Sequence, residues 1–360
     1  MTKAVQKIST EQAYAEELHK LQQQDNAPVP PGWAMSAVAV ERFICGDNAQ
    51  GVARKFVAEQ GVVTRIILSL CTQRGILLTG APGTAKSWLS ELLAAAISHD
   101  STQVIQGGAI SSLSQLLYSW NPQLIQQQGP SLEALVSTPL YRAMRDGKIL
   151  RFEEITRCPQ PLQDAVLSIL SERIMVIPEL PSAQSTHFAT AGFNIVATAN
   201  SVDEGIQRMS SALKRRLSFE HIKPIRHLDD EAQVILQECN KLMAANQIKV
   251  EPAPELIQVL ATIFHELRNG QTLDGRSTDR LAGATMSTAE AVSVAHAIYT
   301  HAYYYQQRRP DATLLLHVLL GSALKDNPED RRRLKHYVET ECGDRKGEFW
   351  QTIYQQRHLI

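Results

Sequence analysis

Three kinds of feature are scarce or missing in the sequence, and each absence narrows the class of protein. Its five cysteines lie far apart, are odd in number and form no CxxC pair, so neither a disulfide framework nor a zinc site is expected. No apolar run reaches membrane-spanning length, and the polar N-terminus lacks the apolar core of a signal peptide. We therefore expect no membrane insertion, no export, and reduced thiols in the cytoplasm.

Net charge is also nearly absent. The 360 residues carry a formal net charge of -1, so the overall charge does not favour nucleic acid as the main partner, although local patches stay open. An apolar fraction of 44% with 20% charged residues is typical of a globular protein, and the length allows two domains.

A glycine-rich segment at residues 75–87, GILLTGAPGTAKS, is the strongest motif. It predicts a short buried strand that leads into a phosphate-binding loop, in which backbone N–H groups and Lys86 contact phosphates and the Ser87 hydroxyl contacts Mg²⁺. The usual pattern has a third glycine before the lysine, where this chain has Ala85. A chance glycine-rich turn is the alternative, but the helical pattern at Trp88–Ile97 favours the functional interpretation. The predicted nucleotide-binding residues are Gly80, Ala81, Pro82, Gly83, Thr84, Ala85, Lys86 and Ser87.

Two carboxylates follow a second apolar strand, predicted at Lys148–Phe152. Parallel strands bind ligands at their carboxyl ends, which would place Glu153 and Glu154 beside the phosphate loop if the strands are neighbours. Glu153 would then hold Mg²⁺, and Glu154 would orient the water that attacks the γ-phosphate. A solvated turn is the alternative for the pair. The metal-side position is usually aspartate in P-loop ATPases, so slower hydrolysis is expected.

A third strand, predicted at Phe193–Ala199, closes on Asn200, whose amide could hydrogen-bond the γ-phosphate or the attacking water. Further on, Arg215 and Arg216 end a helical segment. If subunits pack head to tail, one of them can reach a neighbour's γ-phosphate as an arginine finger. A turn residue and a solvated surface pair are the respective alternatives.

Other segments give coarser expectations. Residues 9–24, 38–70 and 131–146 carry helical patterns, and Val62 and Val63 would line an adenine pocket or pack in the core. Helices dominate beyond Pro224. The predicted domains are an N-terminal helix and linker (1–37), an α/β nucleotide-binding domain (38–224), a helical lid (225–326) and a C-terminal helical extension (327–360).

The segments GAPGTAKS, ILRFEE, IVATAN and ALKRRL, in this order and followed by helices, resemble the AAA+ ATPases and specifically the MoxR type. The resemblance spans about residues 38–325. It implies an α/β P-loop domain with a parallel sheet between helices, followed by an all-α lid. It also implies ATP or ADP and Mg²⁺ as ligands, Glu153 as metal-side acid, Glu154 as catalytic glutamate, Asn200 as first sensor and Arg216 as finger, with Arg215 as the alternative finger or a third sensor.

One part of the pattern does not transfer. The family places a second-sensor arginine at the start of a lid helix, where this chain has Ala289, and Arg276 or Arg280 could substitute. MoxR-type proteins are thought to be chaperone-like remodellers that form hexameric rings, commonly with partners bearing von Willebrand factor A-type domains.

The sequence thus predicts a cytoplasmic, ring-forming, Mg²⁺-dependent ATPase that remodels a protein client or inserts a metal or cofactor into it. The first alternative is a scaffold that binds nucleotide with little hydrolysis, which Glu153 and the missing second sensor favour. The second is a nucleic-acid motor, which the near-neutral charge disfavours.

Overall fold

The structure, a computed structural model, describes residues 7–200, 209–251, 253–281, 286–306, 309–310, 312–324 and 327–360. The predicted domain boundary at residue 326 lies outside these residues. The chain divides into two compact units, one of residues 1–80 and 85–222 and one of residues 81–84 and 223–360. We call them the α/β unit and the helical unit.

A five-stranded parallel sheet forms the centre of the α/β unit, with strand order β2-β5-β8-β1-β9. Its strands are β1 (Gly75–Gly80), β2 (Val104–Gln106), β5 (Ile149–Glu153), β8 (Asn194–Asn200) and β9 (Leu217–His221). Nearly continuous apolar runs make β1, β5 and β8, which is typical of strands buried on both faces. The predicted α/β architecture is confirmed.

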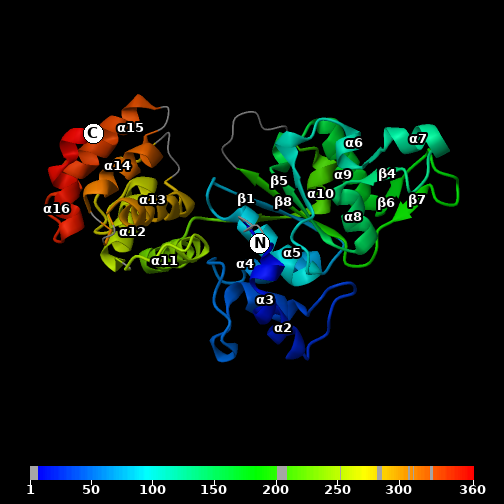
Figure 1. The fold of residues 1–360 in the computed structure, drawn as a ribbon, viewed down its shortest axis with the longest axis horizontal. Coiled ribbons are helices and arrows are strands. Elements are labelled where there is room, and N and C mark those ends of the chain that lie inside the picture. Colours follow the sequence, from blue (N-terminus) through cyan, green and yellow to red (C-terminus); the bar gives the residue numbers. More distant parts are fainter. Residues whose placement is uncertain are drawn as a thin grey trace. The chain divides into compact units, whose positions relative to one another are not determined.

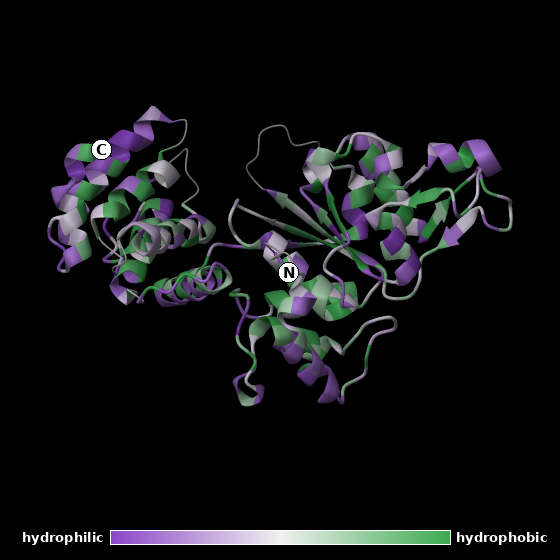
Figure 2. Cartoon of the chain, viewed as in Figure 1, coloured by the Kyte–Doolittle hydropathy of each residue, from purple (hydrophilic) through white to green (hydrophobic). Residues whose placement is uncertain are grey.

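Helices cover both faces of this sheet (Figure 1). Because successive side chains of a strand point to opposite faces, Ile76 and Leu78 pack in one apolar cluster with α3, α4 and α5, whereas Leu77 packs in another with α8 and α9. Figure 2 shows the apolar residues along the strands. The helices are α1 (Thr10–Ala13), α2 (Ala15–Gln23), α3 (Ala37–Cys45), α4 (Val62–Leu70), α5 (Lys86–Ser98), α8 (Pro139–Asp146), α9 (Gln160–Glu172) and α10 (Ser211–Arg216).

Two antiparallel hairpins extend the α/β unit. One pairs β3 (Tyr118–Trp120) with β4 (Leu135–Ser137), and the other pairs β6 (Ile174–Val176) with β7 (Thr186–Phe188). The short helices α6 (Leu113–Leu116) and α7 (Pro122–Gln128) flank β3.

Two helical expectations were too long. Residues 131–146 contain β4 before α8 begins. The helix begins only at Pro139, because Thr138 caps its N-terminus and proline favours the first helical position. Residues 38–70 contain two helices instead of one, since α3 ends at Gly46 with φ 84° and α4 begins only after Gly61 with φ 80°.

The helical unit is built around one apolar core, to which residues from Ala232 to Ile353 contribute. Its helices are α11 (Leu228–Ala245), α12 (Pro254–Asn269), α13 (Thr288–His301), α14 (Ala312–Ala323), α15 (Pro328–Tyr337) and α16 (Glu348–Gln355). Single π-helical segments follow α13 and α15, at Ala302–Gln306 and Val338–Cys342. In the part of the chain that the structure describes, no helix is both long and apolar enough to cross a bilayer.

Candidate functional site

The glycine-rich segment forms a tight loop between β1 and α5. Gly83 and Ala85 both adopt the left-handed conformation, with φ 76° and 61°, and α5 begins at Lys86 directly afterwards. Lys86 is 6% exposed, and its Nζ donates to the Gly80 carbonyl at 3.0 Å across the loop. The first N–H groups of a helix, together with a buried lysine, are the arrangement that binds phosphate.

Ser87 and Glu153 meet immediately beyond this loop. Ser87 Oγ donates to Glu153 Oε2 at 2.6 Å, and Thr198 Oγ1 donates to the same oxygen at 2.7 Å. Glu153 ends β5 and Thr198 lies on β8, which are parallel neighbours in the sheet, and Ser87 lies in the first turn of α5. Thr198 Oγ1 also accepts from the Glu154 N–H at 3.0 Å, so it fixes the chain where β5 ends.

The donor set here suits Mg²⁺. The ion prefers oxygen ligands and is usually held by one or two carboxylates together with phosphate oxygens and water. A hydroxyl and a carboxylate, Ser87 and Glu153, provide such oxygens. Among the described residues, no three His, Cys, Asp or Glu side chains are grouped so that they could hold a metal ion by themselves.

Glu154 follows the end of β5 in an unusual conformation. Its φ is 53°, in the left-handed region that non-glycine residues rarely adopt, and its side chain is 38% exposed. Glu154 Oε2 lies 3.5 Å from Arg157 Nε. Gly107 packs so tightly against this turn that a Cβ there would come within 2.3 Å of the Glu154 carbonyl oxygen. The turn therefore points the two glutamates differently: Glu153 into the protein and Glu154 toward solvent.

Asn200 lies at the same edge of the sheet as the phosphate loop. It ends β8, and its register partner in β1 is Gly80, the residue that begins the loop. Val62 and Val63 open α4 and are 6% and 4% exposed within the apolar cluster on that face of the sheet. The core interpretation of the two valines thus has direct support, and their contribution to an adenine pocket stays a prediction.

Arg215 and Arg216 lie at the opposite edge. They end α10, and the next residue, Leu217, pairs with Gly75 at the start of β1. Gly75 and Gly80 are five residue steps apart along β1, which is about 16 Å at ~3.3 Å per step. Arg216 Nε donates to Ser171 Oγ at 2.9 Å. The structure therefore does not bring these arginines to the phosphate loop of their own chain.

Several residues that touch this site were not predicted. Arg151 of β5 contacts Glu153, Ser90 and Glu91, and all four side chains are buried. The signal was present in the sequence, because a charged residue inside the apolar strand ILRFEE requires partners when buried. Those partners are on α5, far away along the chain, and no local pattern identifies them.

The two candidates for a second sensor have partners within the helical unit. Arg276 Nη2 lies 2.9 Å from Glu341 Oε2, and the Arg280 carbonyl accepts from Arg333 at 2.9 Å. Ala289 occupies the first turn of α13, which Ser287 and Glu290 close with a capping box. The role of either arginine toward nucleotide stays a prediction.

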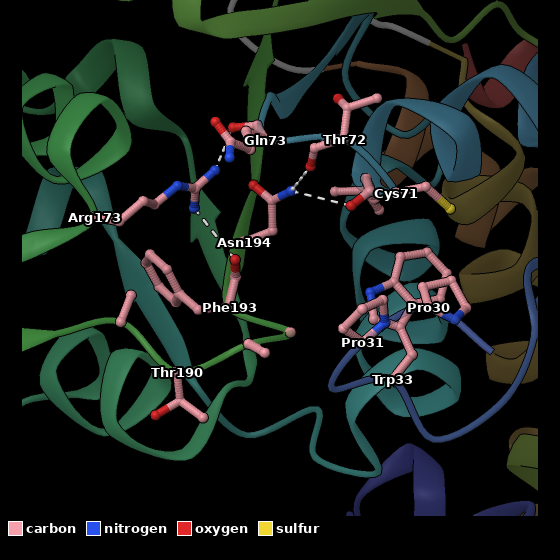
Figure 3. A pocket seen from close by; sticks show the side chains of 14 residues that line it. Pro30, Pro31, Trp33, Cys71, Thr72, Gln73, Arg173, Thr190, Phe193 and Asn194 are labelled. Atoms are coloured by element: carbon pink, nitrogen blue, oxygen red, sulfur yellow. Dashed lines mark hydrogen bonds between the residues drawn. The ribbon is translucent and has the colours of Figure 1, made fainter.

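A cavity of about 380 Å³ lies at the other end of the sheet (Figure 3). Pro30, Pro31 and Trp33 face the segment 189–194 across it, and Asn194 at the start of β8 donates to the carbonyls of Thr72 and Arg74. Burial lowers the pKa of the Arg173 guanidinium, which donates to the Phe193 and Gln73 carbonyls. None of the predicted site residues lines this cavity, so it is separate from the phosphate loop.

Comparison with known proteins gives two family matches. Residues 75–217 match the AAA domain of the dynein-related subfamily, and residues 229–360 match the YehL-like AAA+ ATPase C-terminal domain. The uncharacterized protein YehL of Escherichia coli K12 is 47% identical over 348 residues, which cover 96% of this chain and 95% of that protein. The chain belongs to the YehL-like AAA+ ATPases. The prediction of a MoxR-type AAA+ ATPase, with an α/β domain followed by a helical one, is confirmed.

This YehL-like chain is also similar, at lower identity, to other proteins. Chaperone MoxR1 of Mycobacterium tuberculosis is 25% identical over 201 residues, which are 53% of this chain and 46% of that protein. Among solved structures, NtrX from Brucella abortus in complex with ATP has a TM-score of 0.49 at 15% identity, over 79% of this chain and 62% of that one. The AAA-domain match at 75–217 contains every predicted site residue except Val62 and Val63.

Proposed function

We propose that this YehL-like chain is a Mg²⁺-dependent ATPase that forms a ring and uses ATP turnover to remodel a protein client. The observation that carries the proposal is the 2.6 Å contact between Ser87 Oγ and Glu153 Oε2, directly beyond a loop with phosphate-binding geometry. A hydroxyl and a carboxylate at that place are the protein's share of a Mg²⁺–nucleotide site. Bound Mg²⁺ would neutralise charge on the phosphates, held by Ser87 and Glu153.

The hydrolytic step uses residues at the carboxyl edge of the sheet. Glu154 orients a water molecule and accepts its proton while the water oxygen forms a bond to the γ-phosphorus and the bond to the bridging oxygen of ADP breaks. Lys86 and the loop N–H groups balance the negative charge on the phosphates. Asn200, opposite Gly80, positions the γ-phosphate or the water. Exposure of the Glu154 side chain supports this assignment, because a water molecule must reach it.

A neighbouring subunit completes the site. Because Arg216 directly precedes β9 at the edge of the sheet where β1 begins, and the phosphate loop follows the other end of β1, it is better placed to act on a neighbour's nucleotide, with Arg215 as the alternative. A surface that donates a finger and a different surface that receives it make a heterologous contact, and such contacts close into rings. We propose a homo-oligomeric ring, most simply a hexamer.

The client is proposed as a protein, in the cytoplasm. The likeness to a protein named as a chaperone, MoxR1, supports remodelling, and insertion of a metal or cofactor is the other activity that we propose. A partner with a von Willebrand factor A-type domain fits the same resemblance. The net charge of -1 gives no support to a nucleic-acid substrate.

Phosphate release by the purified full chain tests the hydrolysis proposal. We expect Mg²⁺-dependent turnover that Glu154→Gln lowers by about 10²- to 10⁴-fold while ATP stays bound, and Lys86→Ala is expected to lose ATP binding itself. Glu133→Gln, at an exposed glutamate of the same unit, is the matched control and should keep full turnover. Turnover that survives in Glu154→Gln would contradict the assignment.

A nucleotide-binding scaffold is the second candidate. It is favoured by Arg157, whose Nε lies 3.5 Å from Glu154 Oε2, because a carboxylate that pairs with an arginine is held away from an attacking water molecule. Tight binding of ATP with no phosphate release above background, in the presence of Mg²⁺, would establish the scaffold and exclude the ATPase.

A further inference from the structure

Arg151 is a charged side chain in the middle of a buried strand. It is 9% exposed, and the three nitrogens of its guanidinium all have partners. Nε donates to Ser90 Oγ at 3.1 Å and Nη1 to the Ser101 carbonyl at 3.0 Å. Nη2 donates to the Ser87 carbonyl at 3.3 Å and to Glu153 Oε1 at 3.2 Å. The guanidinium therefore ties the metal-side acid to the first turn of α5.

Each oxygen of the Glu153 carboxylate has two donors. Oε1 accepts from Arg151 and from Ser90 Oγ, the latter at 2.6 Å, whereas Oε2 accepts from Ser87 and Thr198. The side chain is 3% exposed. Arg151 and Ser90 thus hold the oxygen that faces away from the phosphate loop, which leaves Oε2 directed at the Ser87 hydroxyl.

Glu91 is a second carboxylate beside Arg151 Nη2, the nitrogen that also donates to Glu153. Its Oε2 lies 3.6 Å from Arg151 Nη2, and it is itself fixed by Thr10 Oγ1 at 2.6 Å and Lys7 Nζ at 2.9 Å. Two carboxylates and two cations alternate in this cluster, so no charge is buried without an opposite one. Such a cluster restricts the guanidinium to one position, because its planar fork must satisfy several acceptors at once.

We propose that Arg151 is a positioning residue that orients Glu153 toward Mg²⁺-nucleotide. This inference rests on the proposed function. A glutamate at this position has one more rotatable bond than the usual aspartate, so its carboxylate needs an external constraint to present Oε2 at a fixed place. Arg151 and Ser90 supply this constraint through Oε1, and outer partners of metal ligands are commonly needed for full metal affinity.

A purely structural role for Arg151, in which it only ties β5 to α5, makes a different prediction. Its loss would then lower the free energy of unfolding but leave the Mg²⁺ dependence of nucleotide binding unchanged. The Mg²⁺ dependence is therefore the decisive measurement.

The test uses the full chain with Glu154→Gln, so that bound ATP is not consumed. Binding of a fluorescent ATP analogue is titrated with Mg²⁺ from an EDTA-treated start, and the half-saturating Mg²⁺ concentration is recorded. We expect Arg151→Met to raise this concentration by about ten- to a hundredfold. Ser90→Ala, which removes the second donor to Oε1 and the acceptor of Arg151 Nε but keeps the guanidinium, should raise it in the same direction by less. Lys148→Met is the matched control, because Lys148 precedes the same strand and donates to the α5 carbonyl of Ser98 at 2.8 Å without touching Glu153.

Each outcome decides the matter. An unchanged half-saturating Mg²⁺ concentration in Arg151→Met overturns the inference and leaves the proposed function intact. If Arg151→Met does not fold, Ser90→Ala decides: a raised concentration supports the inference and an unchanged one overturns it. A parent chain that binds no nucleotide at any Mg²⁺ concentration overturns the proposed function and this inference together.

Discussion

Each unit of the molecule buries carboxylates among hydrogen-bond donors, and the donors differ in kind. In the α/β unit, three of the four donors to Glu153 are hydroxyl groups. In the helical unit, Glu231 receives both Nη1 and Nη2 of Arg268, at 2.8 and 2.6 Å, and Glu266 receives Arg345 Nη2 at 2.7 and 2.8 Å. Hydroxyl groups are the main donors to the first carboxylate, whereas both oxygens of each of the other two accept from a single arginine.

The kind of hydrogen-bond donor distinguishes a site that can bind a metal ion from ion pairs that only stabilise the fold. A hydroxyl has lone pairs as well as a proton, so Ser87 can turn from donating to Glu153 to donating its lone pairs to a cation, whereas a guanidinium has no acceptor. Glu231 links α11 to α12 and α13, and Glu266 links α12 to Tyr337 of α15 at 2.6 Å. We therefore expect changes in the first cluster to alter activity and changes in the other two to alter stability.

The largest expected effect on turnover comes from Arg216, which belongs to none of the clusters around Glu153, Glu231 and Glu266. Arg216→Ala should lower turnover by about 10³- to 10⁵-fold if this residue is the finger, while nucleotide binding and the unfolding transition stay unchanged. Arg215→Ala tests the alternative finger and should lose less turnover, and the opposite ranking would assign the finger to Arg215. Undiminished turnover in Arg216→Ala would reject the finger assignment.

Mixing two inactive variants shows whether the finger acts between subunits. Arg216→Ala supplies an intact nucleotide site and Lys86→Ala supplies an intact finger, so a mixed ring should regain part of the activity. A mixture as inactive as its components would contradict the exchange of residues between subunits.

The second-largest expected effect is a loss of stability in the helical unit. Glu266→Gln removes one charge from a buried pair and should destabilise the unit by about 3–5 kcal/mol, because Arg345 is left without its counter-charge. Hydrogen exchange of α12 and α15 peptides is the measurement, since a local readout does not require the two units to unfold together. Glu251→Gln, which breaks an exposed pair with Arg309, is the control and should change exchange little. Equal hydrogen exchange in Glu266→Gln and Glu251→Gln would contradict the prediction that the buried pair stabilises the helical unit.

The smallest effect is a pH dependence. Burial alone would raise the pKa of Glu231, but hydrogen bonds from His265 and Arg268 and the Arg268 charge outweigh it, and the pKa lies below its ordinary value of 4.5. A carboxylate with a lowered folded pKa stabilises the native state above its unfolded pKa and loses that contribution as pH falls through the folded value. The melting temperature should thus fall on acidification below about pH 4.5, which is near the ordinary pKa of a glutamate. Glu231→Gln should flatten this dependence, and parallel pH profiles would contradict it.

Local patterns predicted the sheet and the phosphate loop well, because β1, β5 and β8 are apolar runs that end in polar residues. The hairpin strands β3 and β4 were missed, since three residues such as Leu135–Ser137 are too short to show a period of two and Val136 is 47% exposed. Residue types at strand ends predicted Glu153 and Asn200. The partners of Arg151 were beyond reach, because Glu91 and Ser90 meet it only after the crossover between α5 and β5 has folded.

Ala85 shows what the phosphate loop requires of its sequence. The position needs φ near 61°, which costs an alanine about 1 kcal/mol that a glycine avoids. A glycine would in turn make the unfolded chain more flexible, at a cost of similar size. The entropic cost offsets part of the strain, so exchange between alanine and glycine here should change stability by only about 1 kcal/mol. Either residue can therefore occupy this position while the loop keeps its shape. A sequence search that requires three glycines would miss chains that have the same loop with an alanine here.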